Sequence, residues 1–347
     1  MSELQIVAVD PSDPVSFDPF YDVYAAAGRH GAQGEFATVW QRNEVRVAMQ
    51  DPDPSDFRLG WTGSVDGHAV VTGWTHGSTV DNTDILDVAI HCAPDDRGHG
   101  YAAAMLAHVE REARERGRIR LVGEVNWPYA LGASGSGSPD LTWALRNGFE
   151  LGLLDVQRRL PLPVPTALLD ELAAEAAPHH AAYPLVSFLG PVPDELVESW
   201  AALTATLMTE APMGEIEREP AVIDVDRFRA EEAMIERQGR LKVSTGALAP
   251  DGTLVAYSDL VLTVHEAERA YQWGTLVRPD HRGHRLGLAV KVANLRQLQE
   301  TQPDISTVVT FNADVNAAMV AVNDRLGFRP VQWMGEVQKT LARPPLA

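Results

Sequence analysis

The sequence predicts two mixed α/β domains of the α+β type, similar in topology and joined in tandem. The chain has 347 residues, which favours two domains at roughly 100–200 residues each. An internal repeat recurs 185 residues further along the chain, and the proline-rich stretch Leu160–Pro165 lies near the middle. We therefore predict a first domain over residues 1–164 and a second over 165–347, which begins with a connecting helix at Thr166–Ala177.

The composition excludes several classes of function. The chain is 45% apolar and carries a net charge of -19, so a nucleic-acid or anionic membrane surface is disfavoured and a cationic small molecule is attracted. The single cysteine, Cys92, forms no intrachain disulfide, which suits a reducing compartment. There is no signal-peptide pattern and no apolar run long enough to span a membrane. We expect a cytoplasmic protein, monomeric or homodimeric.

The repeat joins the same kinds of element in both copies. Residues 92–102 (CAPDDRGHGYA) recur as residues 277–287 (VRPDHRGHRLG). Each copy follows an apolar run that is typical of a strand and precedes a helical pattern. A second strand then ends in Asn126 or Asn312, and a short helix closes at a Gly-Phe pair. The repeated unit is therefore strand, Arg/Gly turn, helix, strand, helix, strand.

Further elements are expected before each copy. In the first half, helices are predicted over Ser16–Ala27 and Glu35–Met49, and strands over Phe57–Thr62 and Ala69–Thr75. In the second half the corresponding patterns are two helices and two strands, over Asp194–Met208, Val225–Gln238, Leu241–Thr245 and Leu254–Val264. The run Leu131–Pro139 is rich in Gly and Ser, which is typical of a flexible loop. It is either a plain solvent loop or a mobile flap near a ligand.

The repeated turn has the features of an anion site. A strand that enters a Gly-bearing turn and then a helix presents free backbone N–H groups, and the helix dipole adds positive potential. Glycines such as Gly98 and Gly100 allow the backbone to approach an anion closely. The pattern is weak alone, but its recurrence between the same elements favours a ligand over an ordinary strand–helix turn.

With these features, the sequence resembles the GNAT superfamily of N-acetyltransferases, in the tandem layout of actinobacterial members such as mycothiol synthase. The resemblance rests on Pro94, Arg97–Ala102 and Asn147-Gly148-Phe149 in the first copy, and on Pro279, His281–Gly287, Asn312, Asn316, Asn323 and Leu326-Gly327-Phe328 in the second. It implies that each domain has a mostly antiparallel central sheet with a V-shaped splay, flanked by helices.

The resemblance also implies an acetyl-CoA site in each domain, with the pyrophosphate on the turn amides and the pantetheine arm along the preceding strand. The implied cofactor-binding residues are Cys92, Arg97, Gly98, His99, Gly100, Tyr101, Ala102 and Asn126 in the first domain, and Val277, Arg282, Gly283, His284, Arg285, Leu286, Gly287, Asn312 and Asn316 in the second. No metal site is expected.

Two departures from the family pattern bear on activity. The counterpart of Gly100 in the second copy is Arg285. The arginine side chain either blocks the approach of the ligand to the backbone or supplies a cation to the phosphates. We favour the first domain for the tighter cofactor site. The family's usual thiolate-protonating Tyr is replaced by Ala144 and Asn323, neither of which is a useful acid.

The catalytic candidates are correspondingly few. Tyr129 and Tyr271 are possible substitutes for the missing acid, although tyrosine is more commonly a packed core residue. Asp87, or Asp84, precedes the first turn and could serve as the base, unless it is simply a solvated carboxylate. His91 is expected to be structural, and Cys92 is expected to pack rather than to carry an acyl group.

Two functions follow from these patterns. The first is an acetyl-CoA-dependent N-acetyltransferase that acts on a small amine by direct attack in a ternary complex. The alternative is a non-catalytic acyl-CoA-binding protein in which one or both domains are degenerate. The acceptor is not defined by the sequence.

Overall fold

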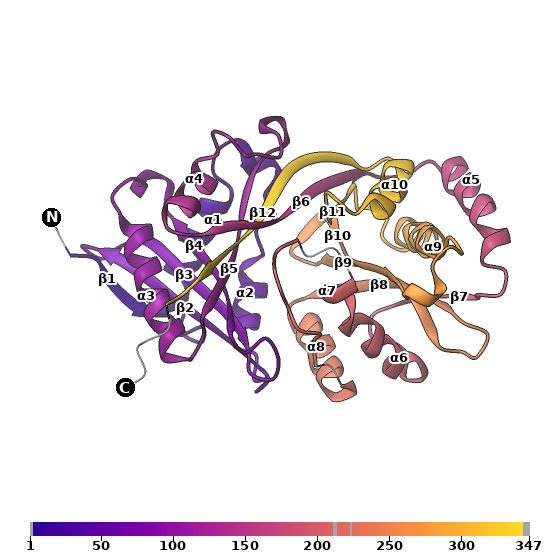
Figure 1. Cartoon of the computed structure of the whole chain (residues 1–347), viewed down its shortest axis with the longest axis horizontal. Helices are drawn as coiled ribbons and strands as arrows, with labels where there is room; N and C mark the ends of the chain where they lie inside the picture. The colour runs from indigo at the N-terminus through magenta and orange to yellow at the C-terminus, as the bar shows by residue number, and fades with distance from the viewer. Residues whose placement is uncertain (1–2, 211–213, 223, 343–347) are drawn as a thin grey trace. The chain divides into compact units, whose positions relative to one another are not determined.

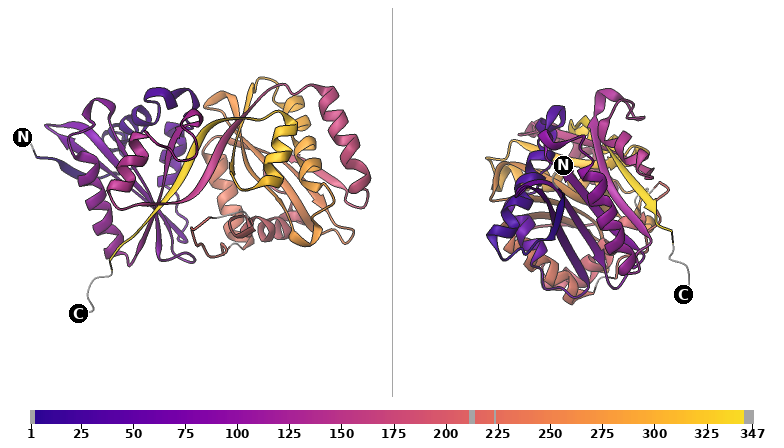
Figure 2. Two further views of the ribbon diagram at one scale, coloured as in Figure 1. Left: turned by 45° about the horizontal axis from the view of Figure 1, so that its top comes forward. Right: turned by 90° about the vertical axis from the view of Figure 1, so that its left-hand side faces the viewer.

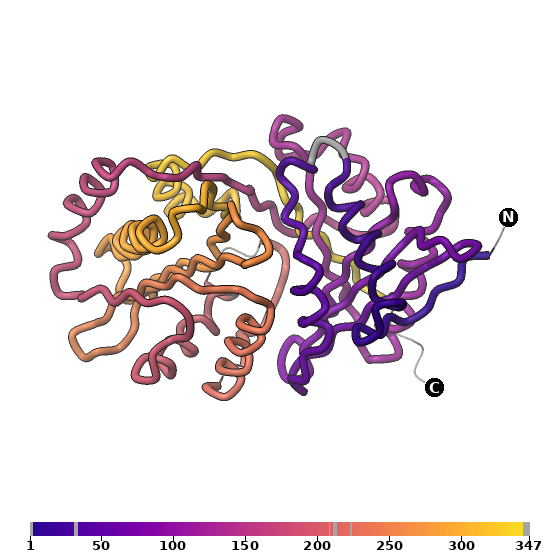
Figure 3. The backbone as a smooth tube through the Cα atoms, turned by 180° about the vertical axis from the view of Figure 1, so that it is seen from behind, coloured from indigo at the N-terminus to yellow at the C-terminus, as the bar shows by residue number. Residues whose placement is uncertain are grey.

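The computed structural model describes residues 3–210, 214–222 and 224–342. These residues form two compact units, which we describe separately (Figure 1; Figure 3 shows the backbone from behind). Unit 1 contains residues 3–154, 214–219 and 332–342, and unit 2 contains residues 155–210, 220–222 and 224–331. Neither unit is a continuous stretch of chain.

The sheet of unit 1 has the strand order β1-β2-β3-β4-β5-β12. All neighbours are antiparallel except β4 and β5, which are parallel. The strands are β1 (Gln5–Ala8), β2 (Asp56–Val65), β3 (His68–Ser78), β4 (Ile85–Cys92), β5 (Arg120–Pro128) and β12 (Arg329–Thr340).

Helices cover both faces of this sheet (Figure 1, Figure 2). On β3, Gly73 faces Met105 and Val109 of α3, whereas its neighbour Trp74 packs with the cluster around Phe17 of α1. Because successive strand residues point to opposite faces, α1 and α3 lie on opposite sides. The helices are α1 (Pro14–Gly28), η1 (Gly31–Phe36), α2 (Arg42–Met49), η2 (Pro94–Asp96), α3 (Tyr101–Glu115), η3 (Tyr129–Leu131) and α4 (Pro139–Arg146).

Unit 2 repeats this plan with the strand order β6-β11-β10-β9-β8-β7. Its one parallel pair among the described strands is β10 with β11. The strands are β6 (Glu150–Pro161), β7 (Leu185–Leu189), β8 (Arg240–Leu248), β9 (Leu254–Thr263), β10 (Glu266–Val277) and β11 (Thr307–Ala313).

Two apolar cores lie on the two faces of the unit 2 sheet. One joins α9 residues such as Leu295 to Val243 and Leu260, and the other joins Trp200 of α6 and Phe228 of α8 to the sheet. The helices are α5 (Thr166–Ala176), η4 (Ala177–His179), α6 (Asp194–Ala205), α7 (Leu207–Glu210), α8 (Val225–Arg237), η5 (Pro279–His281), α9 (Leu286–Thr301) and α10 (Ala317–Leu326).

The two halves of the sequence exchange their last strands. β12, at the C-terminal end, pairs with β5 from Gln332 to Thr340 and completes the sheet of unit 1. β6, which follows α4 in the first half, pairs with β11 from Asp155 to Pro161 and belongs there to unit 2. The two units differ from the expected halves 1–164 and 165–347 at this exchange and at residues 214–219, which lie in the second half of the sequence and belong to unit 1.

The predicted fold class is confirmed, and most predicted elements are found near their expected bounds. The parallel pairing of β4 with β5 stops at Asp87 and Val122, so the strands separate beyond this point and form the expected V-shaped splay. The helix expected over Glu35–Met49 is wrong in its first part, because α2 begins only at Arg42, with Glu44 closing a capping box. The stretch Leu160–Pro165 is also not simply a junction, because its first two residues complete β6.

The run Leu131–Pro139 is anchored rather than free. The Trp127 indole N–H donates to the Gly132 carbonyl at 2.9 Å, and Gly135 lies against the same ring. Ser138 is fully buried and caps α4. The segment is therefore attached to its surroundings at Gly132, Gly135 and Ser138, while most of its other residues are exposed.

Candidate functional site

The first Arg/Gly turn connects β4 to α3 and leaves its backbone open. Gly98 and Gly100 have φ values of +87° and +86°, in the left-handed region. A Cβ at either position would meet no atom within 4 Å. Gly100 is the N-cap of α3, so the first amides of the helix, at Tyr101 and Ala102, have no hydrogen-bond partner within the helix. These positions can receive an anion at the positive end of the helix dipole.

The side chains of Arg97 and His99 in this turn have local partners. The Arg97 guanidinium lies 3.6 Å from Asp140 of α4. The His99 ring Nδ1 lies 3.1 Å from the Asp96 carbonyl oxygen, and the ring stacks on Tyr101 with 5.6 Å between centroids. The turn therefore offers mainly backbone donors, with Arg97 at its edge.

Cys92 ends β4 and contacts the same turn. Its Sγ lies 3.5 Å from the Asp96 carbonyl oxygen, and burial together with Asp96 raises the pKa of the thiol. A thiol with a raised pKa is a poor nucleophile at neutral pH. Its position at the end of the strand is consistent with a structural side chain.

The second turn, between β10 and α9, has the same path but a different fourth residue. Gly283 has φ +88° with open space around it, like Gly98. Arg285 adopts φ +52° and is the left-handed N-cap of α9, where unit 1 has Gly100. Val277 ends β10, and Leu286 and Gly287 begin the helix. The backbone path is thus kept at the cost of a left-handed arginine.

Carboxylates from other elements engage the arginines of the second turn. Arg285 pairs with Glu175 of α5, which also accepts a hydrogen bond from Arg325. Arg282 pairs with Glu210 of α7 at 3.0 Å. The His284 ring Nδ1 lies 3.3 Å from the His179 carbonyl oxygen. The cations of this turn are therefore neutralised within unit 2.

A splay lies beside the turn in both units, because in each the parallel pairing stops before the strands end. In unit 2 the parallel pairing of β10 and β11 stops at Gln272 and Thr310. Asn312 lies on β11 beyond this point and is half-buried. Its counterpart in unit 1, Asn126, lies on β5 opposite Met334 of β12. Asn316 is the N-cap of α10, and its side-chain oxygen accepts from the Met319 amide at 3.2 Å.

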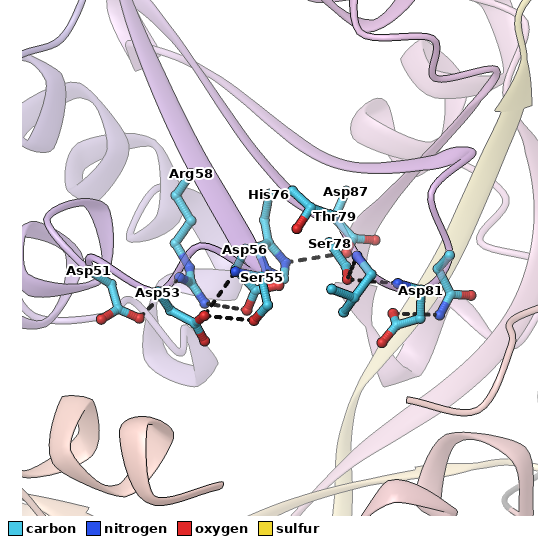
Figure 4. Close-up of polar contacts among 12 residues, drawn as sticks. Asp51, Asp53, Ser55, Asp56, Arg58, His76, Ser78, Thr79, Asp81 and Asp87 are labelled. Carbon is cyan, nitrogen blue, oxygen red and sulfur yellow. Dashed lines mark hydrogen bonds and ion pairs between the residues drawn. The ribbon is translucent and has the colours of Figure 1, made fainter. Parts of the chain in front are cut away.

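Asp87 belongs to an ion cluster at neighbouring positions of β3 and β4 (Figure 4). His76, its cross-strand partner on β3, lies 3.6 Å from Asp87 and 3.6 Å from Asp56. Arg218 donates to Asp87 at 2.9 Å and to Glu336 at 3.3 Å. Asp84 is paired separately with Arg120 at 2.7 Å.

The cluster shifts the pKa values of its members in opposite directions. Burial disfavours the charged form of His76, but the facing Asp56 and Asp87 carboxylates outweigh this effect and raise its pKa. Burial likewise disfavours the Asp87 carboxylate, but His76 and Arg218 outweigh it and lower its pKa. The raised pKa favours the protonated form of His76, and the lowered pKa favours the charged form of Asp87 beside it.

The other sequence candidates have partners of their own. The Tyr129 ring stacks on Trp333 with 5.1 Å between centroids. The Tyr271 hydroxyl donates to Glu266 at 2.8 Å, and burial with the Glu266 charge raises its pKa to about 12. Burial and the Arg97 charge lower the pKa of His91 to about 4, and its ring packs on Tyr24.

Sequence reasoning missed a buried lysine in unit 2. Lys291 of α9 is 2% exposed, and its Nζ donates to Asn323 of α10 at 2.7 Å. Burial lowers its pKa to about 7. The available signal was a lysine within the two-sided apolar pattern of residues 286–298, one of only three in the chain.

The part of the chain that the structure describes holds no cluster of side chains suited to a metal ion. Nor does any described helix have the length and apolar character that a membrane crossing requires.

Comparisons with known proteins bear on the fold. No protein-family model matches the sequence, and no curated protein matches it. A solved tandem GNAT protein from the clavulanic acid biosynthesis pathway is similar over 99% of this chain and 100% of its own, with 24% identity and a TM-score of 0.79. This chain has a tandem GNAT fold.

Other solved GNAT structures agree with this assignment. A GCN5-related N-acetyltransferase from Sphaerobacter thermophilus covers 99% of this chain and 97% of its own, with 14% identity and a TM-score of 0.61. A glucosamine N-acetyltransferase region of a fungal multi-domain beta-N-acetylglucosaminidase covers 97% of this chain and 38% of its own, with 11% identity and a TM-score of 0.64. The tandem GNAT fold therefore extends over nearly the whole chain.

Proposed function

We propose that the protein is an acetyl-CoA-dependent N-acetyltransferase that acts on a small cationic amine. The observation that carries this proposal is the open turn at Gly98 and Gly100, which begins a helix beside a splayed pair of parallel strands. A Cβ at either glycine would project into the space that an approaching pyrophosphate needs. The recurrence of the turn in unit 2 at Gly283 supports the same chemistry there.

The first turn is proposed as the tighter cofactor site. Its glycines place no side chain over the backbone amides, while its arginine, Arg97, lies at the edge and 3.6 Å from Asp140. In the second turn, the side chain of Arg285 occupies the equivalent position and is engaged by Glu175. Because this guanidinium already has an anionic partner, it adds little to phosphate binding and restricts access to the backbone.

The reaction joins the substrate nitrogen to the acetyl carbon. The ammonium group of the substrate first loses a proton to solvent. The resulting neutral amine attacks the thioester carbonyl, the C–N bond forms, the C–S bond breaks, and CoA leaves as a thiolate that takes a proton from solvent. The nitrogen loses one proton to a base. We propose the His76–Asp87 pair for this step in unit 1, with His76 as the proton acceptor and Asp87 stabilising the imidazolium.

Several aspartates lie near this pair and favour a cationic acceptor (Figure 4). Arg218 already pairs with one of them, Asp87. Asp51 and Asp56 lie 3.7 Å from the two ends of the Arg58 guanidinium, so a single arginine serves two anions. The net charge of -19 adds long-range attraction for a cation. A polyamine, an amino sugar or a basic amino acid fits these charges.

Calorimetry with acetyl-CoA, followed by a thiol-release assay over a panel of cationic amines, tests the proposal. We expect acetyl-CoA to bind and at least one amine to release CoA above background hydrolysis. Binding without release for every amine would instead identify a non-catalytic acyl-CoA-binding protein. Absence of acetyl-CoA binding would refute both functions.

A further inference from the structure

A buried hydrogen-bonded network in unit 2 connects α9, α10 and β11. Lys291 Nζ donates to Asn323 Oδ1 at 2.7 Å, and Asn323 Nδ2 donates to Asn312 Oδ1 at 2.5 Å. Lys291 is 2% exposed and Asn323 is fully buried, whereas Asn312 is only half-buried. The Lys291 network, defined as these three residues, therefore runs from the core toward the accessible side chain of Asn312.

The lysine determines the direction of this network. An amide side chain can present either its oxygen or its nitrogen, and the two orientations have similar shapes. In the structure Lys291 Nζ is the donor, so Asn323 turns its oxygen toward Lys291 and its nitrogen toward Asn312. Asn312 must then accept through its oxygen, which leaves its own Nδ2 as the free end of the network.

The free end lies at the splay of unit 2. The parallel pairing of β10 with β11 stops at Thr310, and Asn312 lies two residues beyond on β11. Within the described part of the chain, Asn312 Nδ2 makes no hydrogen bond. An N–H donor is therefore held at the place where the two strands have separated.

Unit 1 has no such network. The position that matches Lys291 in the repeat is Leu106, and the position that matches Asn323 is Ala144, both buried and apolar. The sheet of unit 1 shows that the fold packs well with apolar residues at these sites. Burying a lysine and an asparagine in unit 2 is costly by comparison, so packing alone does not account for them.

We propose that Lys291 and Asn323 are positioning residues that orient the Asn312 amide to donate a hydrogen bond to an oxygen of acetyl-CoA bound in unit 2. The inference rests on the proposed function and identifies how the second site, which lacks the glycine at position 285, holds the acyl end of its ligand. Asn312 contacts the ligand, and the other two residues act through it.

The test uses the full chain with Gly100→Asp, which removes the first site, and measures acetyl-CoA binding by calorimetry together with the melting temperature. Asn323→Asp is the decisive variant. Its carboxylate still pairs with Lys291 but no longer donates, so Asn312 reverses its amide to donate inward. We expect affinity to fall about fivefold, the worth of one neutral hydrogen bond, with no loss of melting temperature. Lys291→Met removes the directing donor and is expected to weaken binding to a similar extent.

Leu298→Ala is the matched control, because Leu298 is fully buried on the same helix and touches none of the three residues through a hydrogen bond. It is expected to lower the melting temperature and to leave the affinity unchanged. In an Asn312→Ala background, Asn323→Asp is expected to have no further effect on binding, since its target is gone.

Unchanged affinity in Asn323→Asp, or an equal loss in Leu298→Ala, would overturn the inference. If the unaltered chain binds one acetyl-CoA that Gly100→Asp abolishes, the inference fails while the proposed function stands. If the unaltered chain binds none, the proposed function fails with it.

Discussion

Replacing Gly100 by aspartate separates the stability of unit 1 from its ability to bind an anion. Gly100 has φ +86° and caps α3, and a Cβ built there meets no atom within 4 Å. The substitution therefore causes no steric clash in the protein alone. It places a carboxylate at the amides where the pyrophosphate of acetyl-CoA is proposed to lie.

The two effects differ in size. A non-glycine residue in the left-handed region costs about 1–2 kcal/mol of stability, which lowers the melting temperature by a few degrees. Two unit charges 4 Å apart repel by about 4 kcal/mol at the effective dielectric constant of a protein surface. Allowing for adjustment of the side chain, about 3 kcal/mol remains, which corresponds to roughly a hundredfold loss of acetyl-CoA affinity at the first site.

Gly67→Asp is the matched control for this experiment. Gly67 lies in the β2–β3 turn with φ +82° and also has no atom within 4 Å of a Cβ. The two variants should lose similar stability in a thermal melt, while only Gly100→Asp loses the first acetyl-CoA in calorimetry. Retained affinity in Gly100→Asp would refute the assignment of the turn, and an equal loss in Gly67→Asp would attribute the effect to unfolding.

Three further predictions concern the other site residues. Arg285→Gly removes a left-handed side chain held by Glu175, so acetyl-CoA affinity at the second site should rise about tenfold in calorimetry, through one more amide bond to a charged group. Burial lowers the pKa of Lys291 to about 7 in the folded protein, whereas its ordinary value is 10.5. Between pH 7 and pH 10.5 the unfolded chain therefore binds more protons than the folded chain, and the free energy of unfolding rises with pH. Urea unfolding at several pH values should show this slope, at most about 1.4 kcal/mol per pH unit, in the parent and not in Lys291→Met. Asp87→Asn removes an anion that raises the pKa of His76, so the rising limb of the pH–rate profile should move to lower pH; an unmoved limb would exclude His76 as the base.

Local patterns predicted the repeated turn well, because its chemistry depends on neighbours in the sequence. The Arg/Gly segment, the strand before it and the helix after it are all found, and Gly98 adopts the backbone conformation that glycine favours. The start of α2 was misplaced because the apolar residues of 35–41 fit a helical period, whereas the capping box at Glu44 determines where the helix begins.

The strand exchange was beyond the reach of the sequence alone. The apolar patterns of β6 and β12 fit an outer strand of either sheet, and the register with β5 or β11 is a contact between distant parts of the chain. The short edge strands β1 and β7 also carry too little pattern to be recognised. Lys291 was missed for a related reason, since its partner Asn323 lies 32 residues away on another helix.

The exchange of β12 has a consequence for how the protein folds during its synthesis. The part of β12 that completes unit 1 consists of residues 332–340. These residues follow nearly all of unit 2 in the sequence and are therefore synthesised after it. During synthesis β5 therefore keeps an unpaired edge until the end of β12 has left the ribosome, and such edges invite pairing with other chains. A nascent first half cannot reach its final structure early, and its exposed edge is the point where a chaperone or a misfolded neighbour would compete with the chain's own last strand.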